Sequence, residues 1–514
     1  MNRATMSLLA GVAALAAITG VAALRPADGT EPRTLEARLP RPVERSALTC
    51  PRPSSSEFAT TWYTAFTPPA SAPESTPEEG GSAELLPAPE YSPGSADEDE
   101  NGENAESGEN GEGTEAEPVA PLAEPGAPVT VTVSDAGAPA LTGTAEAGLA
   151  PGWTVQQTTR VDAGTGRGLL GTACQTPDTE FWFAGASTAE SRHDYVHITN
   201  PDAAATVVDI ELHGPEGRVE TDTAEGFTVP GGTTVPVRLS TLTDEPLGDL
   251  AVHVTARTGR IGAQIEAVDD QRGADWLPPA TAPAGGPVVL PGIPAEATGV
   301  RLVAFAPGDE DVTLEVGLAG PGGTITPAGF ETVSLRSGEL TALDLGNLTQ
   351  GEASSLVLTP AGGSDSGRVV AALQVVGGEE NAAEMAFIPA TSPVEERATV
   401  SGNTGSGTTL ALVAPGDAVE VSVTISAGTE GGEPVTETYT VDGATTLTVS
   451  PEIPDGTQGS YAITVQPSGA PLYAARTLTM GDSDARVFTV QTLPDDRSAV
   501  EVPDTDQDLS IMLD

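Results

Sequence analysis

The amino-acid sequence predicts an all-β protein of tandem antiparallel β-sandwich (immunoglobulin-like) domains, and three observations lead to this fold class. Short runs that alternate apolar and polar residues recur along the chain, without helical periodicity. The chain is rich in Gly (59) and Pro (45), and aromatic residues make up only 4%, which is typical of strands joined by tight turns. One strand–turn–strand pattern also occurs three times, at a spacing of roughly 105–110 residues that fits whole domains.

Each copy of this pattern has a strand, a tight turn that contains Pro, and a second strand of alternating polarity. The turns lie at Asn200, Ala306 and Ala414, each of which is followed by Pro. Further strand–turn–strand pairs follow each copy. Each repeat therefore offers about six or seven short strands, which is the number that a sandwich needs. A β-propeller is the alternative, but its blades require a repeat of about 40–50 residues, and the sequence shows no such half-unit repeat.

Changes in composition divide the chain into segments. Pro-rich joints separate the repeats, and an aromatic residue in each joint, Trp276 or Phe387, is expected to pack and stiffen the interface. A Glu- and Gly-rich stretch has almost nothing to bury, so we predict a disordered, solvated spacer there rather than a calcium-binding segment. The predicted order is 1–24 signal peptide or N-terminal membrane anchor, 25–45 spacer, 46–174 small β domain with a disordered acidic insertion at about 68–128, 175–280, 281–390 and 391–494 β-sandwich repeats, and 495–514 acidic tail.

The N-terminus indicates export. Arg3 precedes an apolar run from Met6 to Leu24, which fits either a cleaved signal peptide or a membrane anchor. We therefore expect an extracytoplasmic protein, secreted or anchored to the cell membrane. In an oxidising compartment Cys50 and Cys174 are predicted to form a disulfide, worth roughly 4–5 kcal/mol in chain-entropy models before strain is subtracted. Two buried free thiols are the alternative.

The charge excludes several classes of partner. The formal net charge is −52, and the basic residues are all Arg. So acidic a chain repels nucleic acid and anionic lipid headgroups, so we expect no nucleic-acid partner and membrane contact only through the N-terminal segment. The absence of Lys also excludes a Gly-Lys-Ser/Thr phosphate loop and a Ser-x-x-Lys nucleophile, and no Gly-x-Ser-x-Gly motif is present.

No metal or cofactor site is predicted. His193 and His197 have the spacing of a helical zinc pair but lie on or beside a predicted strand, so they are interpreted as surface or turn histidines. Asp504 starts a run like a calcium loop, but Leu509 stands where Gly is needed. Asp residues at the Pro turns are interpreted as turn formers rather than calcium ligands; these are Asp202, Asp309 and Asp417.

Two segments carry a family resemblance. Cys174-Gln-Thr-Pro-Asp-Thr-Glu-Phe-Trp-Phe-Ala-Gly185 lies upstream of Ile198-Thr-Asn-Pro-Asp202 and Val207-Val-Asp-Ile-Glu-Leu-His-Gly-Pro-Glu-Gly217. Together they resemble an uncharacterised actinobacterial family of exported proteins, catalogued as a domain of unknown function. The resemblance covers most of the chain after Cys50. It implies a cell-envelope or secreted location, and no activity, cofactor or catalytic residue.

Two functional classes follow. The preferred class is a non-enzymatic exported cell-envelope protein whose sandwiches serve a structural role or bind an envelope protein or a cell-wall glycan. A dense aromatic cluster, Phe181, Trp182 and Phe183, is the candidate binding surface. The alternative is an extracellular hydrolase or carbohydrate-active protein, whose catalytic acids would come from Asp194, Asp209 and Glu211.

Overall fold

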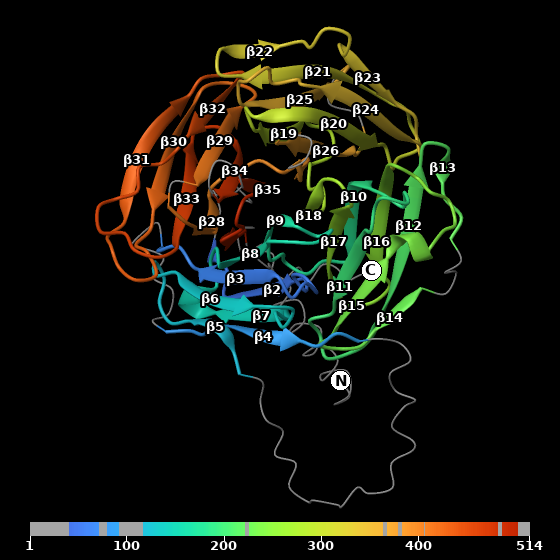
Figure 1. Ribbon diagram of the computed structural model, residues 1–514. Helices are drawn as coiled ribbons and strands as arrows, with labels where there is room; N and C mark the ends of the chain where they lie inside the picture. The colour runs from blue at the N-terminus through green and yellow to red at the C-terminus, as the bar shows by residue number, and fades with distance from the viewer. Residues whose placement is uncertain are drawn as a thin grey trace, which may run out of the picture. The chain divides into compact units, whose positions relative to one another are not determined.

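The computed structural model describes residues 41–70, 80–91, 117–221, 226–362, 367–378, 383–405, 407–481 and 486–501. Residues 42–499 form one compact unit (Figure 1). The described ranges contain β-strands and two short 3-10 turns, η2 (Ala147–Leu149) and η3 (Leu239–Thr241), but no α-helix. None of their helical segments is long and apolar enough to cross a membrane. The predicted signal or anchor, most of the 25–45 spacer and the end of the acidic tail lie outside the described residues.

The described strands form eight antiparallel sheets of four or five strands, which pack in pairs as four sandwiches. In the first, β2 (Arg45–Cys50), β7 (Ala140–Glu146), β4 (Ala83–Ala88) and β5 (Val119–Leu122) pack on β6 (Val129–Ser134), β3 (Ala59–Phe66), β8 (Thr154–Val161) and β9 (Gly168–Ala173). In the second, β10 (Glu180–Ala186), β16 (Leu250–Ala256), β12 (Thr206–Gly214), β13 (Gly217–Arg218) and β14 (Phe227–Val229) pack on β15 (Thr234–Arg238), β11 (Tyr195–Thr199), β17 (Gly262–Asp269) and β18 (Gly273–Leu277).

The third and fourth sandwiches repeat this connectivity. The third has β19 (Val288–Ile293), β25 (Ser354–Pro360), β21 (Val312–Gly320), β22 (Gly323–Ile325) and β23 (Thr332–Leu335), with β24 (Leu340–Gly346), β20 (Ala297–Phe305), β26 (Val370–Gly377) and β27 (Glu384–Pro389). The fourth has β28 (Ala398–Asn403), β33 (Tyr461–Ser468), β30 (Val419–Ile425) and β31 (Val435–Val441), with β32 (Thr445–Val449), β29 (Thr408–Ala414), β34 (Tyr473–Met480) and β35 (Val487–Thr492). The terminal strands β1 (Arg41–Pro42) and β36 (Ala499–Val500) pair with each other. The predicted tandem β-sandwich fold is confirmed.

The predicted acidic insertion contains two strands that the sequence analysis missed. β4 and β5 fall inside the 68–128 stretch, and both belong to the first sandwich. Leu85 and Leu122 are buried in its core. The composition of the whole stretch is dominated by Glu, Gly and Pro, which hid these two short apolar segments. Two parts of the predicted spacer, 71–79 and 92–116, lie outside the described residues.

The Pro turn found three times in the sequence occurs a fourth time, in the first sandwich. Thr67, followed by Pro, stands directly after β3, as Asn200 and Ala306 stand after β11 and β20 and as Ala414 ends β29. The Thr67 hydroxyl donates a hydrogen bond to the backbone oxygen of Leu149 (2.7 Å) and fixes the turn. This copy was hidden because the following strand, β4, begins only at Ala83, far beyond the turn. The fold is therefore a fourfold repeat.

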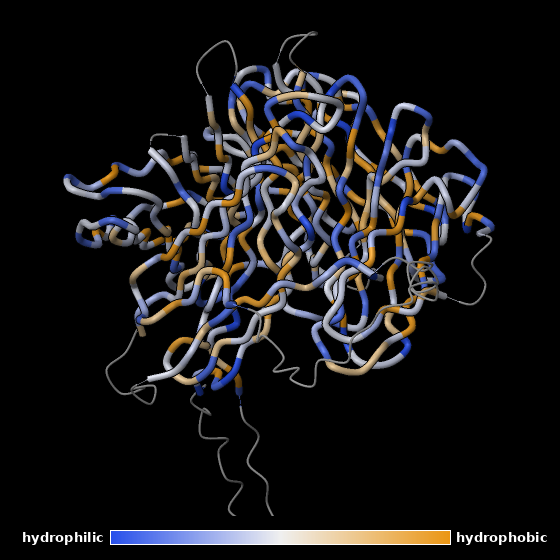
Figure 2. Tube along the Cα trace, turned by 60° about the horizontal axis from the view of Figure 1, so that its bottom comes forward, coloured by the Kyte–Doolittle hydropathy of each residue, from blue (hydrophilic) through white to orange (hydrophobic). Residues whose placement is uncertain are grey.

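One edge strand of each sandwich packs against its counterparts in the others. Within residues 42–499, β9 contacts β18, β18 contacts β27, β27 contacts β35, and β35 returns to β9. Figure 1 shows β9, β18 and β35 near one another between the labelled sheets. In Figure 2 hydrophobic positions follow the packed strands and hydrophilic positions gather in the outer turns. The four sandwiches thus share one closed junction of inner strands.

The joints between successive sandwiches differ in chemistry. From the second to the third and from the third to the fourth they are apolar: Phe305 of the third packs in the core cluster of the second, and Ala475 and Val490 of the fourth pack in that of the third. From the first to the second, the joint is mixed: Leu170 and Trp276 belong to one buried apolar cluster, and Thr172 hydrogen-bonds to Gln264 (2.5 Å) beside it. From the fourth back to the first the joint is polar, with the Gln491 amide donating to Gln156 (3.0 Å).

A buried ion pair completes the joint between the fourth and first sandwiches. Arg397 and Asp496 have side chains only 6% and 8% exposed, and Arg397 Nε donates to the Asp496 carboxylate at 2.6 Å. The same guanidinium reaches two backbone oxygens of the first sandwich, at Pro69 (3.4 Å) and Pro151 (3.3 Å). A side chain at Gly152 would place Cβ 2.3 Å from this guanidinium, so glycine is required there. Three partners therefore depend on one arginine.

Two buried carboxyl groups lie at the junction of inner strands. Asp275 of β18 accepts hydrogen bonds from the Gly171 amide of β9 (3.1 Å) and from the Thr489 hydroxyl of β35 (3.0 Å). Burial raises the pKa of Asp275 well above its usual range, and the nearby charge of Glu384 raises it further. Burial also raises the pKa of Glu384, on β27, to about 7, against the opposing effect of Arg167. Acidic groups from two sandwiches thus share this closed region.

The predicted disulfide is present. Cys50, at the end of β2, is bonded to Cys174, just after β9, with a Cα–Cα distance of 4.4 Å and a sequence separation of 124. Both residues are buried in the core of the first sandwich. The bond therefore fastens one sheet of this sandwich to the inner strand of the other.

Removing this disulfide should destabilise the protein. The double substitution C50A/C174A is expected to lower the free energy of unfolding of the first sandwich by about 2–5 kcal/mol, because a long loop is no longer closed in the unfolded chain. Urea unfolding followed by Trp fluorescence measures this change. Equal unfolding midpoints for the variant and the oxidised parent protein would contradict the assigned role of the bond.

Glu384 should make stability fall as pH rises. The pKa of Glu384 is about 7 in the folded protein and lies above the ordinary value of 4.5. The contribution of this group to the free energy of unfolding is therefore complete below pH 4.5 and is lost as pH rises through about 7. E384Q should remove this loss, which corresponds to about 3 kcal/mol. Urea midpoints at pH 5 and pH 7.5 measure the difference, and E420Q on the exposed part of β30 is the matched control. A parallel pH dependence in E384Q and the parent would contradict the prediction.

Candidate functional site

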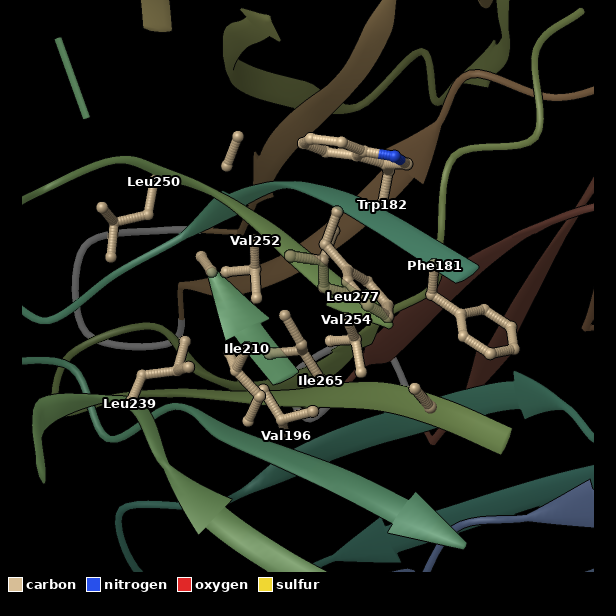
Figure 3. Packing of buried hydrophobic residues seen from close by; sticks show 14 of the residues in the cluster. Phe181, Trp182, Val196, Ile210, Leu239, Leu250, Val252, Val254, Ile265 and Leu277 are labelled. Carbon is tan, nitrogen blue, oxygen red and sulfur yellow. The ribbon is translucent and has the colours of Figure 1, made fainter. Parts of the chain in front are cut away.

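The aromatic cluster predicted as a binding surface is buried. Phe181, Trp182 and Phe183 lie on β10 and are 6%, 6% and 0% exposed. Figure 3 shows Phe181 and Trp182 among packed side chains that include Val252, Val254 and Leu277. The structure therefore gives these aromatics a packing role and no exposed surface, because β10 is an edge strand covered by the next sandwich.

Trp182 fastens the second sandwich to the third. Its ring is stacked on His253 with a centroid distance of 3.9 Å, and on Phe305 of the third sandwich at 5.4 Å. Its Nε1 donates to Glu180 at 2.6 Å, which satisfies the polar end of the indole. Trp276 and Phe387, the aromatics of the Pro-rich joints, are also buried, at 1% and 0% exposure. Trp182, Trp276 and Phe387 are thus buried where the sequence places the joints or where two sandwiches meet.

The histidines take part in structural contacts. His193 accepts a hydrogen bond from Arg238 (2.9 Å), and His197 lies 3.2 Å from Glu266. His213 packs against Phe305, and burial lowers its pKa. In the described ranges no group of three or more His, Cys, Asp or Glu side chains is arranged to hold a metal ion. The Asp504–Asp508 run lies outside the described residues.

The three candidate catalytic acids each pair with arginine. Asp194 is buried with Arg192, whose Nε and terminal nitrogen donate at 3.0 and 2.8 Å, although burial still raises the pKa of Asp194. Asp209 receives two hydrogen bonds of 2.7 Å from Arg257, and these lower its pKa. Glu211 pairs with Arg218 at 2.8 Å. Every one of these carboxylates is occupied by a structural ion pair.

A cavity of about 680 Å³ lies between the third and fourth sandwiches. Its floor is the outer face of the sheet that contains β32, β29 and β34, and its wall is the segment 292–297, from the end of β19 to the start of β20. The floor carries five hydroxyl side chains, and the wall is apolar (Gly292, Ile293, Pro294, Ala295 and Ala297) apart from Glu296. The hydroxyl residues are Thr409, Thr448, Ser450, Thr477 and Thr479. Among the described residues, none forms a side-chain hydrogen bond to these hydroxyl groups.

This cavity exists because three floor positions carry short side chains. Thr409, the fifth residue before the Pro-turn residue Ala414, lies opposite Thr477, and Ser450 directly follows β32 on the other side. In the third sandwich the residue at the place of Thr409 is Arg301, which lies opposite Gln374 and Asp344. The same places therefore hold long or charged groups in the third sandwich and short hydroxyl groups in the fourth.

The joint before the third sandwich shows what the longer side chains do. A cavity is present there too, but it has only about half the volume, about 350 Å³. Arg301 crosses this joint and binds Asp249 of the second sandwich at 2.6 Å. In the first two sandwiches the place of Thr409 is taken by Trp62 and Tyr195, which are also bulky. The hydroxyl-lined cavity is thus a departure of the fourth sandwich from its repeats.

Sequence reasoning missed this site. Thr409 belongs to the third recognised copy of the repeat, and its alignment with Arg301 is visible in the sequence. The pattern does not reveal that these positions face the neighbouring sandwich, because that depends on which sheet packs at the joint. The signal that was available is a change of residue type at one repeat position, from bulky to short and polar.

Comparison with known proteins supplies a family. The model of a family described as "Family of unknown function (DUF5719)" matches residues 129–452, from β6 in the first sandwich to the turn after β32 in the fourth. No curated protein matches the chain in sequence. The matched region is more than half of the 514 residues and includes the Phe181–Gly185 segment on which the resemblance rests. The chain therefore belongs to DUF5719, a family of unknown function.

Proposed function

We propose that the protein is a non-enzymatic, exported cell-envelope protein that uses its four sandwiches as a rigid scaffold and binds a protein or glycan partner between the third and fourth. The observation that carries the proposal is the hydroxyl-lined cavity of about 680 Å³. Its volume lies within the range of about 300–1,000 Å³ typical of ligand sites. Hydroxyl groups without partners in the described protein are available to a ligand.

Rigidity supports a scaffold role. The inner strands pack on one another, the disulfide fastens the first sandwich, and buried Arg397 fastens the last sandwich to the first. A cavity between two sandwiches keeps its shape only if the sandwiches do not rotate against each other. The apolar contact of Ala475 and Val490 with the core of the third sandwich favours such a fixed joint.

Export is supported by two features. A buried disulfide is compatible with an oxidising compartment. The apolar run Met6–Leu24 that follows Arg3 is the sequence pattern of a signal peptide or an anchor.

The pairing of the acids favours binding over hydrolysis. A glycoside hydrolase of the usual kind needs one carboxyl as acid and a second as base or nucleophile on the two sides of the substrate. Asp194, Asp209 and Glu211 are held in ion pairs. The two carboxyls with strongly raised pKa, Asp275 and Glu384, are buried in the junction of inner strands.

Photo-crosslinking in the native cells tests the proposal. A photoreactive residue in place of Thr448, which is exposed at the cavity, should capture an extracytoplasmic partner. The matched control places the same residue at Thr440, which is exposed on β31 outside the cavity. The expected result is an adduct that forms from position 448 and not from position 440. The protein that carries the photoreactive residue should itself be found outside the cytoplasm. Identical adducts from both positions, or a cytoplasmic location, would contradict the proposal.

A further inference from the structure

We infer that the cavity between the third and fourth sandwiches is a site for an uncharged carbohydrate, such as a short stretch of a neutral polysaccharide. This inference rests on the proposed function, because it names the chemistry of the ligand for the same site. It follows from the hydroxyl groups of the floor, from the charge of the lining and from the apolar wall.

The floor presents a row of hydroxyl groups. The row runs across three neighbouring strands and consists of Ser450 after β32, Thr409 on β29 and Thr477 on β34. Neighbouring strands are about 4.7–4.9 Å apart. A hydroxyl group both donates and accepts hydrogen bonds, which is also true of each hydroxyl group of a sugar. Because the row spans several ångströms, its members can reach different hydroxyl groups of one ring or of two linked rings.

The lining does not favour a charged ligand. Its charged residues are one of each sign, Glu296 and Arg486, and both are exposed. At the equivalent joint Arg301 of the third sandwich forms an ion pair with Asp249, whereas the fourth sandwich has the short, neutral Thr409 in place of Arg301. The net charge of −52 also opposes the approach of anionic polymers. A neutral polar ligand fits this balance.

The wall provides apolar surface opposite the hydroxyl row. Pro294, Ala295 and Ala297 come from the third sandwich, and the half-buried ring of Phe488 comes from β35. A sugar ring has polar edges and a face of C–H groups, so it can place its edges on the hydroxyl row and its face on the apolar wall. Binding sites generally combine such apolar surface with a few placed polar groups.

A panel of defined sugars tests the inference on the full chain. The probes are neutral trisaccharides built from glucose, galactose, mannose, arabinose and xylose, with trigalacturonate as the anionic probe and deacetylated chitotriose as the cationic probe. Saturation-transfer NMR detects binding, and calorimetry measures the affinity. At least one neutral trisaccharide should bind more tightly than about 1 mM, and both charged probes should bind more weakly.

Three variants locate the site. T409A/T477A removes two hydroxyl groups without filling the cavity and should weaken binding by at least about tenfold. T409R/S450D/T477Q introduces the residue set of the third sandwich and should abolish binding. T438A/T440A changes two exposed threonines of β31 outside the cavity and should leave the affinity unchanged. Far-UV circular dichroism and the thermal midpoint confirm that each variant is folded.

The outcomes separate this inference from the proposed function. No binding of any neutral trisaccharide overturns the inference, as does binding that survives T409R/S450D/T477Q, or a preference for a charged probe. If the crosslink at Thr448 still captures a protein partner in that case, the proposed function stands and only the carbohydrate is rejected. If both experiments fail, both are rejected.

Discussion

The arrangement of the four sandwiches depends on the mutual contact of their inner edge strands, β9, β18, β27 and β35. An edge strand exposes unpaired backbone groups and is prone to unwanted pairing. Here each inner strand is covered by its neighbours, and backbone contacts such as the Ala274 amide to the Arg167 oxygen (2.9 Å) cross the joints. Because the contacts return from β35 to β9, no inner strand is left without a neighbour. Each of the four sandwiches has its own core, and their inner strands in addition form one shared junction.

The repeats use one framework and vary it at the joints. Strand connectivity and the Pro turns are common to all four sandwiches. The residues at the joints differ, from the Trp182–Phe305 stack to the Gln491–Gln156 hydrogen bond. Framework positions therefore determine the fold, and joint positions determine how tightly neighbours pack. A site can arise where a joint position is shortened, as at Thr409, without disturbing any strand.

Sequence reasoning predicted what local pattern controls. The alternating runs and the turns at Asn200, Ala306 and Ala414 predict the sandwiches, and the two cysteines predict their bond. Sequence reasoning missed β4 because this strand has only six residues and lies within a stretch of acidic composition. It placed Phe181, Trp182 and Phe183 at a surface because aromatic density alone does not show which strand edge a neighbour covers. The cavity needs the packing of one sheet face on the next sandwich, which no local pattern specifies.

Hydrogen exchange of the backbone amides tests most directly whether the inner strands form a shared junction. If they do, amides of β9, β18, β27 and β35 should exchange as slowly as those of the central strands β3, β11, β20 and β29 in the same sheets. The edge strand β31, whose outward residues are exposed, provides the fast reference. Exchange of the inner strands at the rate of β31 would show that the sandwiches are independent units and would contradict this account.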